Sequence, residues 1–279
     1  MSDPGRSNRL ADYLARVGLD TLPAPDAAGL ASLQRAQRLT IAFENLDIPL
    51  GRGIAINGDS VFAKLVRAGR GGYCFEQNRL LADMLALLGL PTRPLLARVW
   101  LLLLPGEVPP RTHTLLLAEL GGELWIADAG FGGGFCPPLP LRDGATAGSP
   151  DGASHRLRRA GAAGSIPGEW LLERRAAGST AWLAQYGFDS AEVALADLEA
   201  ANHWTATRRG TRFTTLHVAS RVLPTGLAAL TDRTFTRFDG PASTSCTIAT
   251  PAEWHALLTG TIGIALPPED VAALPLFMG

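Results

Sequence analysis

The spacing of apolar residues changes once along this chain of 279 residues, at Pro91, and that change limits the fold class. Before Pro91, apolar residues recur every three or four positions, which predicts helices. The last such run contains Leu80, Leu81, Met84, Leu85 and Leu88. After Pro91, segments 94–104, 112–120 and 123–129 are short, rich in Leu, Val and Ile and bounded by Gly or Pro, which is typical of strands. Helices followed by strands favour an α+β architecture over alternating βαβ units.

The flanking segments extend this pattern. Earlier helices are predicted around 10–17, 30–39 and 61–66, and the last one begins near Cys74. Further along, 169–186 and 211–223 are predicted to be strands, 251–259 a short helix, and the C-terminus irregular. The segment 136–168 is rich in Gly, Pro and Ala, which predicts a long loop.

The composition excludes several classes of protein. Apolar residues make up 47% of the chain and charged residues 18%, so global disorder is excluded. The 25 basic and 26 acidic residues give a net charge of −1, and we therefore expect no nucleic-acid partner. We also expect no membrane association, because the most apolar stretch, 95–104, is too short to span a bilayer and contains Arg98.

Cysteine and histidine usage indicates a reduced protein without a metal. Cys74, Cys136 and Cys246 are an odd number, lie far apart and form no CxxC pair. The five histidines show no metal-ligand spacing such as HExxH. The N-terminal residues contain no continuous apolar run of the kind found in secretory signals. We therefore expect a cytoplasmic protein with neither a disulfide framework nor a metal.

Cys74 is the first candidate for chemistry. It follows a glycine turn in RAGRGGYCFEQN, residues 67–78, and opens the predicted helix. A helix N-terminus favours negative charge, which lowers the pKa of a thiol placed there. The alternative is a small buried hydrophobic residue, which is the commoner role of an intracellular cysteine.

A nucleophilic cysteine needs a base, and the base needs a group that orients it. His113 opens one predicted strand and Asp128 lies near the end of the next. If Gly121 and Gly122 form a two-residue hairpin, position 115 pairs with 128, and Asp128 lies diagonal to His113 on one face. The sequence therefore predicts a Cys-His-Asp triad, against the alternatives of a core histidine and a turn-capping carboxylate.

Two further local features suggest supporting roles. The run GFGGG, residues 130–134, resembles a phosphate-binding loop only loosely, and it could equally be a flexible turn or the lining of a cleft beside Asp128. Glu44 and Arg70 are predicted to form an ion pair that joins the first helices to the Cys74 loop.

These segments resemble the signatures of the arylamine N-acetyltransferase family. The segments RGGYCFEQN, THTLLL and WIADAGFG resemble its three active-site signatures, in the same order along the chain. IAFENLDIPLG resembles its N-terminal signature and NHWTATRRGTRFTTLHVASR a segment of its C-terminal lobe. The chain departs from the pattern at Ala42, where the family commonly has Pro, and at Gln37-Arg38, in a region where a His is common.

The resemblance implies a three-lobed fold with a cysteine-protease-like core. A helical bundle over 1–90 would carry the cysteine, a β-barrel-like lobe over 91–200 the histidine and aspartate, and an α/β lid would cover 201–279. It further implies acetyl-CoA as donor, an aromatic amine or hydrazine as acceptor, and a role in xenobiotic metabolism.

The resemblance also implies roles for individual residues. Cys74 would be the nucleophile, His113 the base and Asp128 its orienting partner, in a ping-pong reaction through an acetyl-cysteine. The residues implied to line the cleft for CoA and the acceptor are Trp100, Thr112, Gly132 and Phe213. Independently of the resemblance, the aromatic residues Trp100, Phe131 and Phe213 could line an apolar pocket or belong to the core.

Three other functions remain open. A Cys-His-Asp triad also serves cysteine hydrolases. An amide synthase of antibiotic biosynthesis, a branch of the same family, would keep the triad and act on a carrier-bound acyl chain. A binding protein that has lost its chemistry would keep the fold without a reactive thiol.

Overall fold

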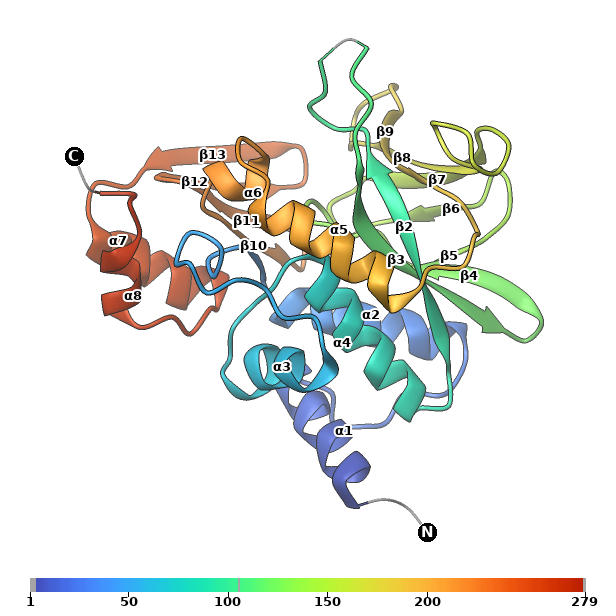
Figure 1. Cartoon of the computed structure of the whole chain (residues 1–279), viewed down its shortest axis with the longest axis horizontal. Coiled ribbons are helices and arrows are strands. Elements are labelled where there is room, and N and C mark those ends of the chain that lie inside the picture. The colour runs from blue at the N-terminus through green and yellow to red at the C-terminus, as the bar shows by residue number, and fades with distance from the viewer. Residues whose placement is uncertain (1–3, 105, 278–279) are drawn as a thin grey trace.

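The chain forms helices before Pro91 and mainly strands after it (Figure 1). The computed structural model describes residues 4–104 and 106–277. It is a mixture of helices and two antiparallel sheets, as the α+β prediction requires. The division into 1–90, 91–200 and 201–279 stays a prediction, and its positions 1–3, 105 and 278–279 lie outside the described residues.

The N-terminal helices pack around one apolar core. They are α1 (Pro4–Val17), α2 (Ala27–Thr40), α3 (Gly58–Phe62), which continues as a π-helical turn over Ala63–Arg67, and α4 (Cys74–Leu87). Tyr13, Leu30, Leu33, Leu65 and Leu81 are fully buried between them. Asp26 caps α2 by accepting the N–H of Gly29, which fixes where that helix begins.

Eight strands follow and form a nearly closed, barrel-like sheet, in the order β5-β4-β3-β2-β9-β8-β7-β6. Their bounds are β2 (Thr92–Val99), β3 (Arg111–Leu120), β4 (Glu123–Ala127), β5 (Leu139–Pro140), β6 (Thr146–Gly148), β7 (Ser154–Arg159), β8 (Trp170–Arg175) and β9 (Leu183–Phe188). Leu95, Leu115, Leu157 and Leu172 fill the inside of this sheet.

The hairpin predicted at Gly121-Gly122 is confirmed, with its register. Leu120 pairs with Glu123, and the pairing continues to Leu116 opposite Ala127. Both glycines have positive φ, 59° and 81°, the conformation that a two-residue hairpin turn of this type requires. Asp128 comes directly after the last paired residue, at the end of β4.

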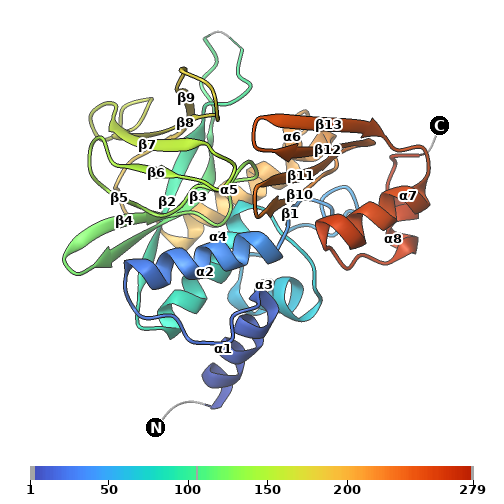
Figure 2. The ribbon, with the colours of Figure 1, turned by 180° about the vertical axis from the view of Figure 1, so that it is seen from behind.

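The C-terminal part forms a second sheet, covered on one face by helices (Figure 2). Its order is β1 (Phe43–Glu44), β10 (Val218–Leu223), β11 (Gly226–Thr231), β12 (Thr234–Asp239) and β13 (Ala242–Thr247). The covering helices are α7 (Pro251–Ala256), which continues as a π-helical turn over Leu257–Ile262, and α8 (Pro268–Ala273). Because β1 comes from the N-terminal part, its pairing with β10 ties the two ends of the chain together.

Two more helices, α5 (Leu195–Thr207) and α6 (Arg212–Thr215), connect the sheets. The sequence did not predict α5. Its buried residues are Asn202 and Thr205, and the apolar Leu198 and Ala201 that pack beside them are only partly buried, so polar residues interrupt the apolar stripe that would predict a helix. The predicted strand over 211–223 is wrong in its first half, where α6 forms, and right from Val218 onward.

Three other predictions need correction. The segment 136–168 is not one long loop, because it contains β5, β6 and β7; in β7, buried His155 and Leu157 alternate with partly exposed neighbours. The predicted strand 94–104 ends at Val99, since Leu102 has φ of 58° and leaves the sheet. The irregular C-terminus contains α8. None of the described helices is long and apolar enough to cross a bilayer.

The core around α4 generates a stability prediction. Leu81→Ala should lower the free energy of unfolding by about 2–5 kcal/mol, because it leaves a cavity at a fully buried position. Leu124→Ala on the outer face of β4, where the leucine is exposed, should change it by no more than about 0.5 kcal/mol. Urea unfolding of both variants measures the difference, and equal losses would contradict this account of the core.

Candidate active site

Cys74 is the first residue of α4, and its thiol is almost completely enclosed. The residue is 4% exposed, and its Sγ lies 3.7 Å from the carbonyl oxygen of Thr112 on β3. The start of α4 is fixed by Glu76, whose carboxylate accepts the N–H of Tyr73 at 3.0 Å. The thiol therefore stands at the positive end of the helix dipole and faces the strand that carries His113.

His113 and Asp128 meet across the β3–β4 hairpin, as the predicted register requires. Nε2 of His113 lies 2.7 Å from Oδ2 of Asp128, and both side chains are 3% exposed. The second carboxylate oxygen, Oδ1, accepts the side-chain amide of Asn78 at 3.0 Å and the N–H of Gly130 at 2.8 Å. The carboxylate is thus held by three donors, and it fixes the orientation of the imidazole.

The electrostatics of this pair favour a charged imidazole. Burial by itself would lower the pKa of His113, but the charge and hydrogen bond of Asp128, together with the adjacent Cys74 thiol, raise it to about 10. Burial raises the pKa of Asp128, yet the contacts with His113, Asn78 and Gly130 outweigh burial and lower it. Asp128 is therefore an anion at neutral pH.

The thiol of Cys74, the imidazole of His113 and the carboxylate of Asp128 lie next to one another in that order, as a nucleophile, a base and an orienting group would. Asp128 occupies Nε2 of His113, which leaves Nδ1 to exchange a proton with the Cys74 thiol. Moving that proton creates a thiolate at a helix N-terminus beside a carboxylate-stabilised imidazolium, which is how proteins activate a cysteine nucleophile.

Three other predicted site residues, Phe131, Phe213 and Gly132, each pack against the ring of a neighbouring side chain. Phe131 packs its ring edge-on against His113, with 5.2 Å between centroids. Phe213 contacts Phe43 and Tyr73, at 5.8 Å and 5.7 Å. Gly132 lies against the Phe43 ring so closely that an added Cβ would stand 3.0 Å from it.

Trp100 is the predicted site residue that the structure places apart. It follows the end of β2, its backbone N–H donates to the carbonyl oxygen of Gln185, and its indole lies over Gly187 of β9. None of its described contacts involves Cys74, His113 or Asp128. Thr112 lies next to the thiol, but through its backbone carbonyl.

Sequence reasoning missed the polar residues that support the site from behind. Asn78 lies one helical turn after Cys74, bonds Asp128, and accepts the N–H of Ala129 at 2.9 Å. Gln34 on α2 accepts the N–H of Asp128 at 3.0 Å. Arg38, one turn later on α2, donates to three carbonyl oxygens of the loop that follows Asp128. The sequence offered one signal for Gln34 and Arg38: they recur at helical spacing on the face of α2 that also carries Leu30 and Leu33.

A buried ionic network lies under the start of α4. The predicted pair of Glu44 and Arg70 is confirmed, at 2.8 Å, and Asp47 extends it, at 3.0 Å from the same guanidinium. Lys64 then joins Asp47 to Glu76, at 2.7 Å to each. Because Glu76 holds the N–H of Tyr73, this network connects β1 to the residue before Cys74.

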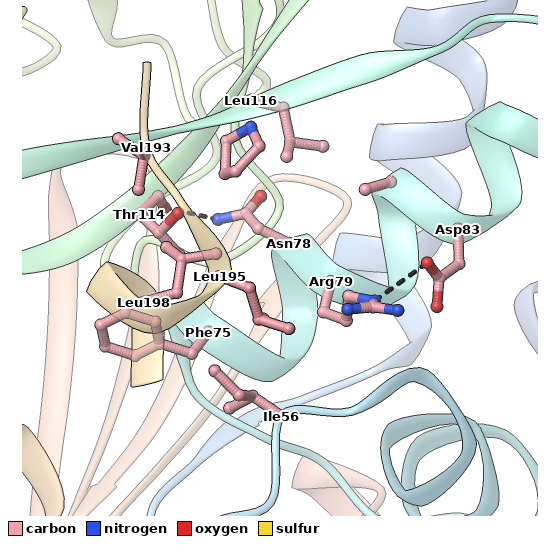
Figure 3. A pocket seen from close by; sticks show the side chains of 12 residues that line it. Ile56, Phe75, Asn78, Arg79, Asp83, Thr114, Leu116, Val193, Leu195 and Leu198 are labelled. Atoms are coloured by element: carbon pink, nitrogen blue, oxygen red, sulfur yellow. Dashed lines mark hydrogen bonds and ion pairs between the residues drawn. The ribbon is translucent and has the colours of Figure 1, made fainter. Parts of the chain in front are cut away.

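A cavity of about 330 Å³ lies beside α4, between that helix, β3 and α5 (Figure 3). Its walls are largely apolar and include Phe75, Leu116 and Leu198. Cys74, His113 and Asp128 do not line it; it meets the site only through Asn78, whose amide donates to the carbonyl oxygen of Thr114 at 2.7 Å. This cavity is therefore separate from the Cys74 thiol.

Three of the four remaining histidines, His155, His217 and His255, lie away from the site, and His203 is exposed on α5. His217, which has no evident partner in the sequence, lies 2.9 Å from Asp232. His155 is buried on β7 rather than in a loop, and His255 bonds the carbonyl oxygen of Leu266. Within the described residues, no three His, Cys, Asp or Glu side chains gather in a way that could hold a metal ion.

Comparison with known proteins places this site in a family. A family model described as N-acetyltransferase matches residues 26–271. The arylamine N-acetyltransferase of Escherichia coli (strain K12) is 35% identical over 92% of this chain and 89% of its own length. The chain belongs to the arylamine N-acetyltransferase family. The family is one of acyltransferases, and this chain is an acyltransferase.

Solved structures of the family have the same fold. The arylamine N-acetyltransferase from Salmonella typhimurium superposes with a TM-score of 0.87 at 31% identity, over 95% of this chain and 97% of that one. The Mycobacterium marinum arylamine N-acetyltransferase in complex with CoA gives 0.85 at 27% identity, over 95% and 98%.

The contact between the Gly130 loop and α4 generates a second prediction. A Cβ at position 130 would lie 2.6 Å from Cα of Cys74 and from the Asn78 amide nitrogen, so Gly130→Ala must push the loop away from the helix. We expect the alkylation rate of Cys74 by iodoacetamide at pH 7 to fall about tenfold to a hundredfold. Gly133→Ala is the control, because its Cβ would meet nothing closer than 3.9 Å. Similar rates in the two variants would contradict the proposed contact.

The coupling of Asp128 to His113 generates a third prediction. In Asp128→Asn the charge that raises the pKa of His113 is lost, burial then favours the neutral imidazole, and proton transfer from Cys74 to His113 should be disfavoured. Alkylation at pH 7 should fall at least about tenfold, and the rate should rise at a higher pH than in the wild type.

The matched control is Asp232→Asn, which removes the carboxylate beside His217 and should leave the profile unchanged. Cys246 is exposed and also reacts, so the Cys74 peptide is followed by mass spectrometry. A wild-type profile in Asp128→Asn would show that the carboxylate does not set the charge of His113.

Proposed function

We propose that this protein transfers the acetyl group of acetyl-CoA to the amino group of an arylamine or arylhydrazine, through an acetyl-Cys74 intermediate. The observation that carries the proposal is the placement of His113 between the Asp128 carboxylate and the Cys74 thiol at the start of α4. Family membership supports the reaction type, and the CoA complex of the Mycobacterium marinum protein supports the donor.

The first half-reaction begins with proton transfer from the Cys74 thiol to Nδ1 of His113. The thiolate attacks the thioester carbonyl carbon of acetyl-CoA, and the new C–S bond forms as the oxygen becomes an oxyanion. Backbone N–H groups at the start of α4, that of Cys74 among them, would stabilise that charge. The bond to the CoA sulfur then breaks, and CoA leaves with the proton from His113.

The second half-reaction releases the acetyl group to the acceptor. The amine nitrogen attacks the acetyl-Cys74 carbonyl carbon, and His113 takes the proton that the nitrogen loses. The bond to Sγ breaks, and the proton returns to Cys74. An aromatic amine suits this step because it is neutral at pH 7 and keeps its lone pair. CoA leaves before the amine reacts with the acetyl-enzyme, so the kinetics are ping-pong.

The residues around the Cys74 thiol are proposed to line the cleft that binds the two substrates. Phe131 and Phe213 are both partly exposed and would receive the aromatic ring of the acceptor. Gly132 and the Thr112 backbone would border the path to Cys74. Trp100 is a weaker candidate, because its contacts are with β9. The proposal also includes the three-lobed division of the chain, a cytoplasmic location and a role in modifying foreign aromatic amines.

The deciding experiment is intact-mass measurement after mixing the protein with acetyl-CoA alone. We expect one added acetyl group on the wild type and none on Cys74→Ser. Adding an arylamine should then remove the adduct much faster than water does, because the enclosed thioester is shielded from solvent.

The other outcomes distinguish the remaining functions. Rapid loss of the adduct in water would indicate a cysteine hydrolase. A hyper-reactive Cys74 without an adduct would indicate another acyl donor, as in an amide synthase that takes carrier-bound chains. An inert Cys74 would indicate a binding protein.

A further inference from the structure

Arg38 is a buried cation that none of the proposed steps uses. It lies on the inner face of α2, is 2% exposed, and has no carboxylate within 4 Å among the described residues. Moving an unpaired guanidinium from water into a protein interior is costly, so the contacts of Arg38 must offset that cost. The contacts are all with one short loop.

The guanidinium holds the loop that follows Asp128 by its carbonyl oxygens. Nη1 donates to Ala129 at 3.3 Å, and Nη2 donates to Phe131 at 2.8 Å and to Gly133 at 3.0 Å. Three carbonyls on alternate residues match the forked geometry of an arginine, which a lysine could not reproduce. The segment 129–133 thus has one fixed path across the end of α2.

Two residues along this stretch of chain contact the imidazole. At its start, Asp128 bonds Nε2 of His113; in its middle, Phe131 packs edge-on against the same ring. Tyr186 on β9 packs against both rings, with its centroid 4.8 Å from that of His113 and 5.2 Å from that of Phe131. Holding the loop therefore holds two of the groups that fix the His113 ring.

The charge of Arg38 also balances the site. With Cys74 as thiolate and His113 as imidazolium, Asp128 leaves one uncompensated negative charge, which Arg38 neutralises. The other ionisable groups packed around the loop do not supply this charge. Asp151 and Arg174, beside Gly134, pair with each other at 2.6 Å, and Tyr186 and Cys136 are neutral because burial raises the pKa of each.

We propose that Arg38 is a positioning residue for the Cys74 chemistry: its guanidinium holds the 129–133 loop against His113 and supplies the countercharge of Asp128. The proposal rests on the proposed function of Cys74 as nucleophile. It assigns Arg38 no contact with substrate.

The test compares Arg38→Gln with Arg38→Lys in the full chain carrying Cys246→Ser. For each we would measure iodoacetamide alkylation of Cys74 against pH, the rate of acetylation by acetyl-CoA, and thermal unfolding. Removing a nearby positive charge favours the protonated forms of the site. Alkylation of Cys74 at pH 7 should therefore be about threefold to tenfold slower in Arg38→Gln than in the wild type.

Arg38→Lys separates the two parts of the role. It keeps the charge and loses the fork, so alkylation of Cys74 at pH 7 should keep the wild-type rate, while the acetylation rate falls about tenfold to a hundredfold. Arg35→Gln is the matched control, because Arg35 is exposed on the same helix and its loss should alter none of the three measurements.

The outcomes keep the two proposals apart. A wild-type Cys74 no more reactive than a free thiol would overturn the nucleophile itself. If wild-type Cys74 is reactive and both Arg38 variants lower only the unfolding temperature, with unchanged alkylation profiles and acetylation rates, the guanidinium is merely structural and the inference is wrong. If Arg38→Gln does not fold, Arg38→Lys still decides. A wild-type acetylation rate in Arg38→Lys would show that the forked hydrogen bonds of the guanidinium are not needed, and the inference would be wrong.

Discussion

The buried Asp128 carboxylate is the group on which the geometry of the site depends. A carboxylate at this depth is tolerated only when hydrogen bonds and a countercharge replace the water it has lost. Its oxygens bond His113 on β3, Asn78 on α4 and the N–H of Gly130. The need to satisfy one anion thus fixes a strand, a helix and a loop relative to one another, and the Cys74 thiol takes its place because Asn78 lies on the same helix.

The helices contribute more polar contacts to the interior than a helical bundle normally would. Gln34 and Arg38 on α2 meet the backbone on either side of Asp128, and Asn78 on α4 meets it again at Ala129. Each contact replaces a hydrogen bond that this irregular segment cannot make within the sheet, because β4 ends at Ala127. The apolar residues of these helices stabilise the fold, whereas their buried polar residues determine the path of the loop.

Sequence reasoning reached the part of this arrangement that follows from local rules. The register around Gly121-Gly122 follows from turn chemistry, and it brings His113 opposite the segment that begins at Asp128. The position of Cys74 at a helix start follows from the glycines before it. Glu44 and Arg70 were predictable as opposite charges that could join the first helices to the Cys74 loop.

The parts that were missed depend on tertiary contacts. The strands β5 to β7 are short and rich in Gly, Pro and Ala at their ends, so their pairing with β4, with each other and with β8 overrides their local preference for turns. The helix α5 buries Asn202 and Thr205, and the first of these bonds Tyr73, which lies next to Cys74. A polar helix face of this kind looks like a solvent-exposed surface in the sequence, and only the partner across the interface shows that it is buried.

The same reasoning explains why Arg38 carried no signal as a functional residue. An arginine within a helix is most often solvated, and its spacing with Leu30, Leu33 and Gln34 was the only indication that it points inward. Once buried, it must be matched by acceptors. The carbonyl oxygens that follow Asp128 are available as acceptors, because this loop has no strand partner whose N–H groups would donate to them. The irregular backbone beside the thiol and the buried charge on α2 therefore stabilise each other, and each would be costly without the other.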